Sequence, residues 1–168
     1  MRRTITMTLL ATAVALSGQA TAGSSCSITG TNGRDRLIGT PGDDFICALG
    51  GRDFIKGKGG DDVIQAAGGR DVVIAGPGND RVVAGPRADV LDGNAGDDIL
   101  EGQGGRDFLR GFGGADTLRG GRGGDCLYSF DNVGGNDLAD GGPGTDVYDI
   151  DPGDTLLNAE QAGSCAGD

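Results

Sequence analysis

The sequence contains no histidine and no tryptophan, and only 4% of its 168 residues are aromatic. Without histidine the chain cannot form a Ser-His-Asp triad or an HExxH zinc site, and it has no G-x-S-x-G motif. So few large apolar side chains also make an ordinary packed core improbable. We therefore expect that the protein is not an enzyme and that its fold is not a conventional globular one.

Basic residues are scarce as well, because 14 Lys and Arg stand against 25 Asp and Glu, which gives a net charge of -11. A chain with this balance would be repelled by phosphate backbones. We expect no nucleic-acid partner.

Long hydrophobic runs are missing except near the N-terminus, where Arg2 and Arg3 precede an apolar stretch from Ile5 to Leu16. The small-residue triplet 20–22 then resembles a cleavage site, so residues 1–22 are predicted to be a secretion signal that is cleaved after Ala22. A membrane anchor is the alternative, but the run is shorter than the ~20 residues of a spanning helix. We expect a secreted, extracellular protein without stable membrane insertion.

Cysteines are few but even in number, with Cys26, Cys47, Cys126 and Cys165. In an exported chain this favours two disulfides, with unpaired buried thiols as the alternative. The spacings suggest one disulfide at each end, Cys26 with Cys47 and Cys126 with Cys165. They would secure an N-terminal cap at 23–29 and a C-terminal cap at 159–168.

Glycine, in contrast, is abundant at 36 residues, and it recurs with a period of nine. Counted from Gly30, eleven nonads run to Tyr128, the insertion 129–131 follows, and three more nonads end at Asn158, so fourteen nonads fill 30–158. Position six is aspartate in every nonad except the last, which has Thr155. These thirteen aspartates are Asp35, Asp44, Asp53, Asp62, Asp71, Asp80, Asp89, Asp98, Asp107, Asp116, Asp125, Asp137 and Asp146.

Each nonad reads as a turn followed by a short strand. Position four is glycine except at Arg87, which indicates a positive φ or a close backbone approach. Positions seven to nine are rich in β-formers, and position eight is aliphatic from Leu37 to Leu127, followed by Ala139, Tyr148 and Leu157. One buried residue per nonad is too little for an isolated unit, so the repeats must stack as an all-β solenoid.

Position five indicates that one coil holds two nonads, because its residue type alternates with a period of eighteen. Odd nonads carry Arg34, Arg52, Arg70 and Arg106, whereas even nonads carry Asp43, Asp61, Asn79 and Asp97. The odd turns would then line one edge of the solenoid and the even turns the other. We call these the arginine edge and the acidic edge. Duplication of an eighteen-residue unit explains the alternation equally well and predicts the same architecture.

Position seven of the odd nonads forms a second pattern, with Phe54, Val72, Val90 and Phe108. If these side chains point outward, they form an apolar ladder suited to self-association or to another surface partner. Simple β-propensity is the alternative explanation.

The aspartates indicate a metal. Equivalent residues of adjacent coils would lie about 4.8 Å apart, and two bare carboxylates at that distance repel by about 3.5 kcal/mol at an effective dielectric of 20. The available ligands are carboxylate and carbonyl oxygens, which favours Ca²⁺, several ions in all, with Mg²⁺ as the second choice. One ion would take ligands eighteen residues apart, such as Asp44 with Asp62. Because the core is thin, folding is expected to depend on the metal.

The nonad resembles GGxGxDxUx, the hemolysin-type calcium-binding repeat of RTX (repeat-in-toxin) proteins, from Gly30 to about Asn158. The resemblance implies a parallel β-roll of about seven coils with two nonads per coil and position eight in its interior. It also implies that turn carbonyls and the thirteen aspartates bind calcium. The best-supported function is a secreted calcium-binding protein that folds on extracellular calcium. The alternative is a calcium-dependent adhesion, matrix or protein-interaction module.

Three departures qualify that resemblance. Arg87 at position four should distort the turn around Asp89, and the arginines beside the odd carboxylates should weaken calcium binding at that edge. The export signal is N-terminal, whereas RTX proteins usually carry a C-terminal, uncleaved one.

The glycine and arginine bias suggests a bacterial source with a GC-rich genome.

Overall fold

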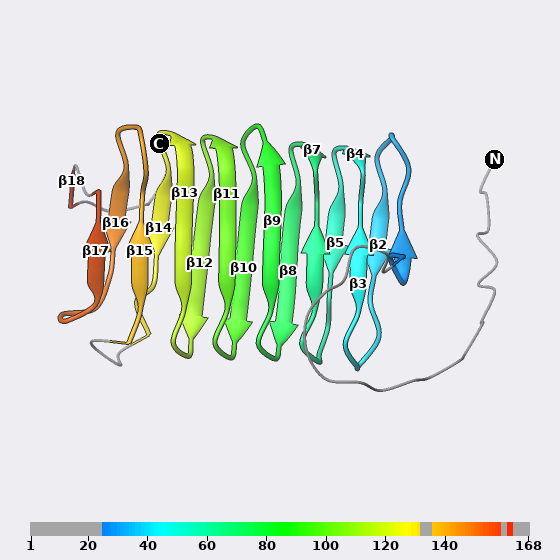
Figure 1. Cartoon of the computed structure of the whole chain (residues 1–168), viewed down its shortest axis with the longest axis horizontal. Coiled ribbons are helices and arrows are strands. Elements are labelled where there is room, and N and C mark those ends of the chain that lie inside the picture. The colour runs from blue at the N-terminus through cyan, green and yellow to red at the C-terminus, as the bar shows by residue number, and fades with distance from the viewer. Residues whose placement is uncertain (1–24, 132–135, 159–160, 163–168) are drawn as a thin grey trace.

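The computed structural model describes residues 25–131, 136–158 and 161–162, and the chain in these ranges forms a parallel β-roll of about seven coils (Figure 1). The predicted signal at 1–22 and most of the predicted cap at 159–168 lie outside the described residues. Strands and turns make up the roll, so the part of the chain that the structure describes has no helix able to cross a membrane.

Two parallel eight-stranded sheets form the two faces of the roll, and successive nonads alternate between them. The first sheet contains β1 (Ile28–Thr29), β3 (Phe45–Cys47), β6 (Val63–Gln65), β9 (Arg81–Pro86), β11 (Ile99–Gly105), β13 (Thr117–Gly123), β15 (Leu138–Asp140) and β17 (Thr155–Leu157). The second contains β2 (Arg36–Ile38), β5 (Phe54–Lys56), β8 (Val72–Pro77), β10 (Val90–Ala95), β12 (Phe108–Gly113), β14 (Cys126–Tyr128), β16 (Val147–Asp149) and β18 (Gln161–Ala162).

The register between neighbouring strands confirms two nonads per coil. Val90 pairs with Val72 on one side and with Phe108 on the other, which is a step of eighteen residues in each direction. After the insertion at 129–131 the step becomes 21, as in the pairing of Thr117 with Leu138. The inserted residues are therefore accommodated within one coil, and the strands on either side stay aligned.

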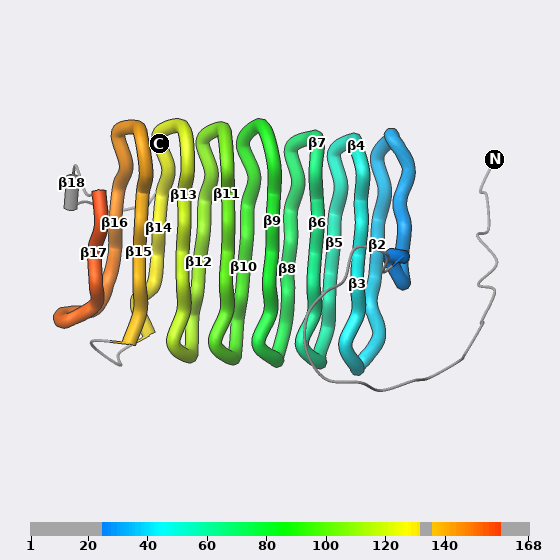
Figure 2. Tube along the Cα trace, in the orientation of Figure 1, coloured from blue at the N-terminus to red at the C-terminus, as the bar shows by residue number. Residues whose placement is uncertain are grey.

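The strands in the middle of the roll are longer than the expected three residues. From β8 to β13 they span six or seven residues because the backbone bonds between coils continue into the next turn. Short pairs form within turns too, where β4 (Gly50–Gly51) lies beside β7 (Gly68–Gly69) at the upper edge of Figure 1. That edge holds the odd turns, so the even turns lie at the lower edge. Both edges run nearly straight along the roll (Figure 2).

The core is a single row of side chains from each sheet, as position eight predicts. Residues from Ile46 to Tyr148 at this position are buried, whereas their neighbours at positions seven and nine are largely half-buried or exposed. Position one adds to the core wherever alanine replaces glycine, at Ala48, Ala66, Ala75 and Ala84. The interior is therefore thin but continuous along the roll.

The last nonad corrects the sequence register by one residue. Ala139 pairs with Leu156, so Leu156 packs against the core, and Leu157, expected there, is 45% exposed. The backbone N–H of Asp137 points to Oδ1 of Asp154 at 3.4 Å, so Asp154 and not Thr155 takes the aspartate place. This nonad is one residue short, a deletion that strict counting by nine does not reveal.

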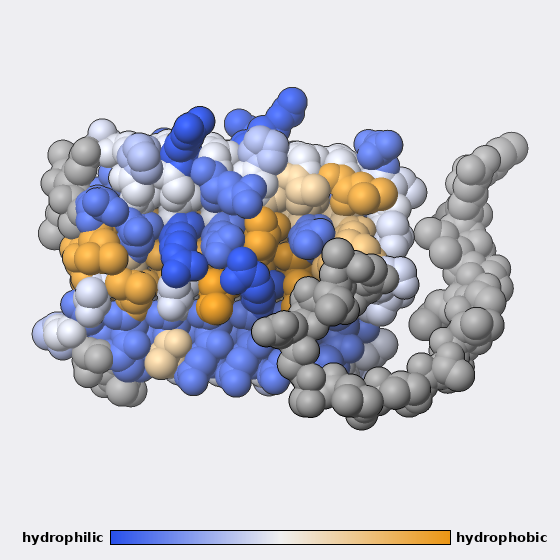
Figure 3. Space-filling model, viewed as in Figure 1, coloured by the Kyte–Doolittle hydropathy of each residue, from blue (hydrophilic) through white to orange (hydrophobic). Residues whose placement is uncertain are grey.

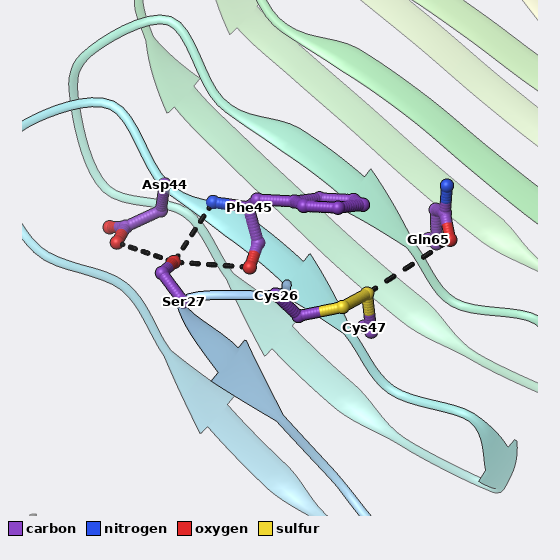
Figure 4. Close-up of a disulfide and its surroundings, with 6 residues drawn as sticks. All are labelled: Cys26, Ser27, Asp44, Phe45, Cys47 and Gln65. Carbon is purple, nitrogen blue, oxygen red and sulfur yellow. Dashed lines mark hydrogen bonds between the residues drawn. A yellow bond between two sulfur atoms is a disulfide. The ribbon is translucent and has the colours of Figure 1, made fainter. Parts of the chain in front are cut away.

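At the N-terminal end of the roll, β1 lies against β3 of the first coil. Ile28 pairs with Ile46 and packs against the core, and Cys26 is disulfide-bonded to Cys47 (Figure 4). Cys126 is disulfide-bonded as well, and Cys165, its expected partner, lies outside the described residues. The disulfide joins the segment before β1 to β3, the strand that pairs with β1.

Candidate metal centre

The position-six aspartates form two hydrogen-bonded columns, one along each edge. On the acidic edge, Oδ1 of Asp62 accepts the backbone N–H of Asp44 at 2.8 Å, and Oδ1 of Asp80 accepts that of Asp62 at 2.7 Å. On the arginine edge the same bond joins Asp53 to Asp71 at 2.8 Å. The columns continue past the insertion. The structure therefore brings equivalent predicted ligands together, eighteen or 21 residues apart.

The second carboxylate oxygen of these residues is buried and has no partner in the part of the chain that the structure describes. This holds for eleven of the thirteen predicted ligands: Asp53, Asp62, Asp71, Asp80, Asp89, Asp98, Asp107, Asp116, Asp125, Asp137 and Asp146. Each of these residues is at most 3% exposed. Burying a carboxylate oxygen without a partner is unfavourable, so a repeated set of eleven indicates a cation that the fold is built to receive.

The pKa values of the position-six aspartates reflect the same buried environment. Burial, and after it the neighbouring carboxylates Asp44, Asp43 and Asp61, raise the pKa of Asp62 to about 6, although the Asp44 amide opposes this. Burial and then the carboxylates of Asp116, Asp80 and Asp97 raise the pKa of Asp98 to about 7. Burial thus makes the charged form of these carboxylates costly, and a bound metal ion would offset that cost.

On the arginine edge the pKa of Asp71 is also raised, by burial and then by the charge of Asp53, and burial raises that of Asp89 to about 7. Position-five carboxylates contribute on the acidic edge alone. The two columns therefore share burial and differ in their outer charge.

Backbone oxygens complete the ligand supply. A Cβ placed on Gly78 would collide with the carbonyl oxygen of Gly60, and one on Gly76 with that of Lys58, so these carbonyls face the next coil. Their oxygens and the carboxylate of position six are hard ligands of the type that Ca²⁺ prefers. Glycine at these positions lets the backbone of one turn approach the oxygens of its neighbour.

The two turns of the first coil differ from the rest. The backbone N–H of Thr31 donates to Oδ2 of Asp35, and that of Thr40 to Oδ2 of Asp44, each at 2.6 Å. Neither threonine has the positive φ found at position two of later turns, such as 74° at Leu49. The second oxygen of Asp35 and Asp44 is thus already satisfied within its own turn. These two predicted ligands fit a capping role better than a metal site.

Arg87 takes the place of a position-four glycine without breaking the column. It adopts a φ of 92°, close to the 99° of Gly60 at the same position of another turn. The Asp71 amide still donates to Asp89 at 2.7 Å, and the Asp89 amide to Asp107 at 2.9 Å. The expected distortion around Asp89 is therefore confined to the backbone strain of Arg87 itself.

A second ladder runs along the acidic edge at position five. Oδ1 of Asp43, Asp61 and Asn79 accepts the amide of position five in the next coil, at 2.8 Å in each case. The bond from Ala115 to Asp97 continues the ladder at the same distance. Sequence reasoning found the charge of these exposed residues but missed their structural bonds. The signal is their Asx character, since Asp and Asn share the accepting oxygen.

The apolar ladder of the second sheet is present in register, with Phe54, Val72, Val90 and Phe108 in adjacent strands. All four are half-buried, and an arginine side chain covers each of the two phenylalanines. The guanidinium of Arg36 lies 5.5 Å from the ring centre of Phe54, and that of Arg110 lies 5.3 Å from that of Phe108.

Taken together, the donors fit a metal bound between successive turns and not a compact cluster. Among residues 25–131, 136–158 and 161–162, no three acidic or cysteine side chains converge on one point. One or two carboxylates with several carbonyls would therefore have to hold each ion, as the regular spacing of turns allows. Asp62 and Asp80 carry such carboxylates on adjacent turns, and the carbonyls of Lys58 and Gly60 face the next coil of the same edge.

Comparison with known families agrees with this geometry. The RTX calcium-binding nonapeptide repeat matches in four copies, at residues 29–55, 48–82, 74–109 and 92–127, which together span more than half of the chain. No curated protein sequence matched the chain. The matched repeats are calcium-binding repeats. The chain therefore belongs to the RTX calcium-binding nonapeptide repeat family.

Proposed function

We propose that the protein is a secreted calcium-binding protein whose roll folds when it meets extracellular calcium. The observation that carries the proposal is the set of eleven buried Oδ2 atoms that have no partner among the described residues and are stacked in two columns. In the absence of a cation, carboxylates of adjacent coils repel each other in a buried setting. Calcium between the turns removes both the repulsion and the unsatisfied oxygens.

The thin core strengthens the coupling between metal and fold. Position eight supplies one buried side chain per nonad, and position one adds only four alanine methyl groups. Backbone ordering costs about 1–2 kcal/mol per residue, and so few apolar side chains offset only part of it. A chain of this kind gains its remaining stability from what it binds.

A circular dichroism titration of residues 23–168 tests the coupling. We expect a disordered spectrum in calcium-free buffer and a cooperative gain of β-structure as calcium is added. Magnesium at the same concentration should be much less effective, because it demands a stricter octahedral geometry. Full β-structure in excess chelator at neutral pH contradicts the proposal.

Export is supported by the features of 1–22 and by the disulfide between Cys26 and Cys47, since such bonds persist in oxidising compartments. Mass spectrometry of the protein recovered from culture medium tests it. We expect a chain beginning at Gly23 with no free thiol. Retention of 1–22 in a cell-associated protein contradicts export by a cleaved signal.

Adhesion through the apolar ladder is the second candidate, and the contacts of the ladder weigh against it. Arg110 covers Phe108 and also forms an ion pair with Asp92 at 2.6 Å, so the face is partly occupied by its own side chains. The changes Phe54→Ser and Phe108→Ser test this role. Calcium-dependent association that both changes abolish would favour adhesion through this face. A calcium-loaded protein that stays monomeric with or without the two changes favours simple calcium binding.

A further inference from the structure

The arginine edge presents one exposed arginine in each of the first six coils. Position five supplies four of them: Arg34, Arg52, Arg70 and Arg106. In the fourth coil position five is Ala88, and Arg87 supplies the charge from position four. The sixth coil carries Arg122 at position three. The row is thus continuous even where the repeat pattern changes.

Arg87 shows that this continuity is maintained against a backbone preference. A φ of 92° is unfavourable for any residue with a Cβ, and glycine holds the corresponding place in the neighbouring turns, as at Gly105 with a φ of 147°. Arg52, Arg70 and Arg87 also line a common surface pocket with Pro86.

These arginines have no acidic partner among the described residues. The ion pairs there involve Arg81, Arg110 and Arg119, which lie on the sheet faces. The carboxylates of the arginine edge are buried in its column from Asp53 onward. A chain with a net charge of -11 therefore exposes a positive edge.

The opposite edge presents the complementary row. Asp43, Asp61 and Asp97 are exposed, and Asn79 holds the place between them. Each carboxylate uses Oδ1 to accept an amide of the next coil at 2.8 Å, which fixes the side chain and leaves its second oxygen for another partner. In Figure 3 the part of the lower edge that grey atoms leave uncovered is a hydrophilic band. Fixed side chains lose less entropy when they form an ion pair.

We propose that two copies of this chain associate side by side, with the arginine edge of one against the acidic edge of the next. Both edges have the same coil spacing and run nearly straight along the backbone (Figure 2), so a simple translation aligns every coil with its counterpart. Arg34 then faces Asp43, Arg52 faces Asp61, and Arg87 faces Asp97. The third coil pairs Arg70 with Asn79.

The resulting contact joins two different surfaces, so it does not close on itself. Each added copy leaves one free edge of each kind, and association therefore builds an open lateral array. A single exposed ion pair contributes little, but a row of pairs with fixed partners acts together. Such an array needs a folded roll. It depends on calcium only through that fold.

Sedimentation velocity of the 23–168 protein in saturating calcium tests the array. We expect the average mass to rise with protein concentration at about 0.1 M salt and to fall toward the monomer near 1 M, where the Debye length shortens from about 10 to about 3 Å. The triple change R34E, R52E and R70E should raise the concentration needed for association by more than about tenfold. Circular dichroism confirms that each variant is folded.

The triple change D43N, D61N and D97N tests the acidic edge in the same way. Asparagine keeps the accepting oxygen of the ladder, as Asn79 already does, so the coil contacts remain and the charge is lost. This variant should also fail to associate. The arginine variant keeps its acidic edge, so adding it to the native protein should terminate arrays and lower their mass.

Two results overturn the proposal. One is a monomer at every concentration and salt level, with the arginine edge binding a polyanion such as heparin instead. The other is association that neither triple change affects. Failure of calcium binding appears separately, as loss of the folded spectrum in calcium, so it cannot be confused with failure of the array.

Discussion

Oδ1 of Asp80 accepts the backbone N–H of Asp62 at 2.7 Å, while Oδ2 of the same carboxylate is buried and has no partner within residues 25–131, 136–158 and 161–162. One side chain therefore has two separate tasks. Its first oxygen ties one coil to the next, and its second is available to a cation. Substitutions can separate these tasks, because asparagine retains the accepting oxygen and alanine retains neither.

For Asp80 we expect the Asn variant to bind calcium roughly tenfold more weakly, because one ligand charge is lost. The Ala variant should in addition lower the stability of the calcium-loaded roll by about 1 kcal/mol or more, since the Asp62 amide loses its acceptor. Calorimetric titration and urea unfolding in calcium measure the two effects. Equal stability of the two variants would show that the amide bond is unimportant.

The two edges should differ in calcium affinity. Asp43 and Asp61 add negative potential around Asp62, and Arg52 and Arg70 stand beside the carboxylates of the other column. The changes D62N and D80N together should therefore reduce affinity more than D71N and D89N together. Calcium titrations of the two double variants at one ionic strength make the comparison. Equal losses would refute the asymmetry.

The first coil should contribute little to calcium binding. Oδ2 of Asp44 already accepts the Thr40 amide, whereas Oδ2 of Asp62 has no partner in the described part of the chain. We expect D44N to leave the number of bound calcium ions unchanged and D62N to lower it. Equilibrium dialysis with calcium-45 counts the ions in each variant. A loss of bound calcium in D44N would show that the first coil does form a metal site.

Stability without calcium should depend on pH in a defined direction. The pKa of Asp98 and Asp89 is raised to about 7, and that of Asp62 and Asp80 to about 6, above the value near 4 of an unfolded chain. Between about pH 4 and 7 the folded chain thus holds more protons than the unfolded chain, so acidification favours folding in this window and rising pH opposes it.

We therefore expect calcium-free protein to gain β-structure as the pH is lowered from 8 to 5. Calcium affinity should rise as the pH is raised from 5 to 8, because protons leave the sites. Circular dichroism in resin-treated buffer and titrations at several pH values measure both effects. A calcium-free spectrum that is constant across this range contradicts the raised pKa values.

Arg87→Gly should stabilise the calcium-loaded roll by about 1 kcal/mol, because glycine adopts a φ of 92° without the Cβ penalty. Gly105→Ala is the matched control in the next turn of the same edge. A Cβ there would collide with the carbonyl of Arg87, so this change should destabilise. Urea unfolding in calcium and about 1 M salt, where charged edges are screened, gives both values. No gain from Arg87→Gly would show that the strain is compensated locally.

The period of nine determined most of the fold. Aspartate at position six, glycine at position four and one aliphatic residue at position eight permit only a turn and a short strand, and the alternation at position five assigned each turn to its edge. These are local constraints on φ and on side-chain direction, and they repeat at every step. For that reason residues such as Ile64 and Asp62 could be placed without coordinates.

Tertiary structure decided what depends on contacts between coils. Only the pairing of strands revealed that the last nonad is one residue short, with Leu156 in the core and Asp154 in the column. Thr31 and Thr40 satisfy their carboxylates because the first coil bends its turns differently, although its sequence has the same aspartates. Whether a carboxylate oxygen is satisfied or left for calcium depends on the amide that the fold brings to it, and a repeat pattern specifies the carboxylate alone.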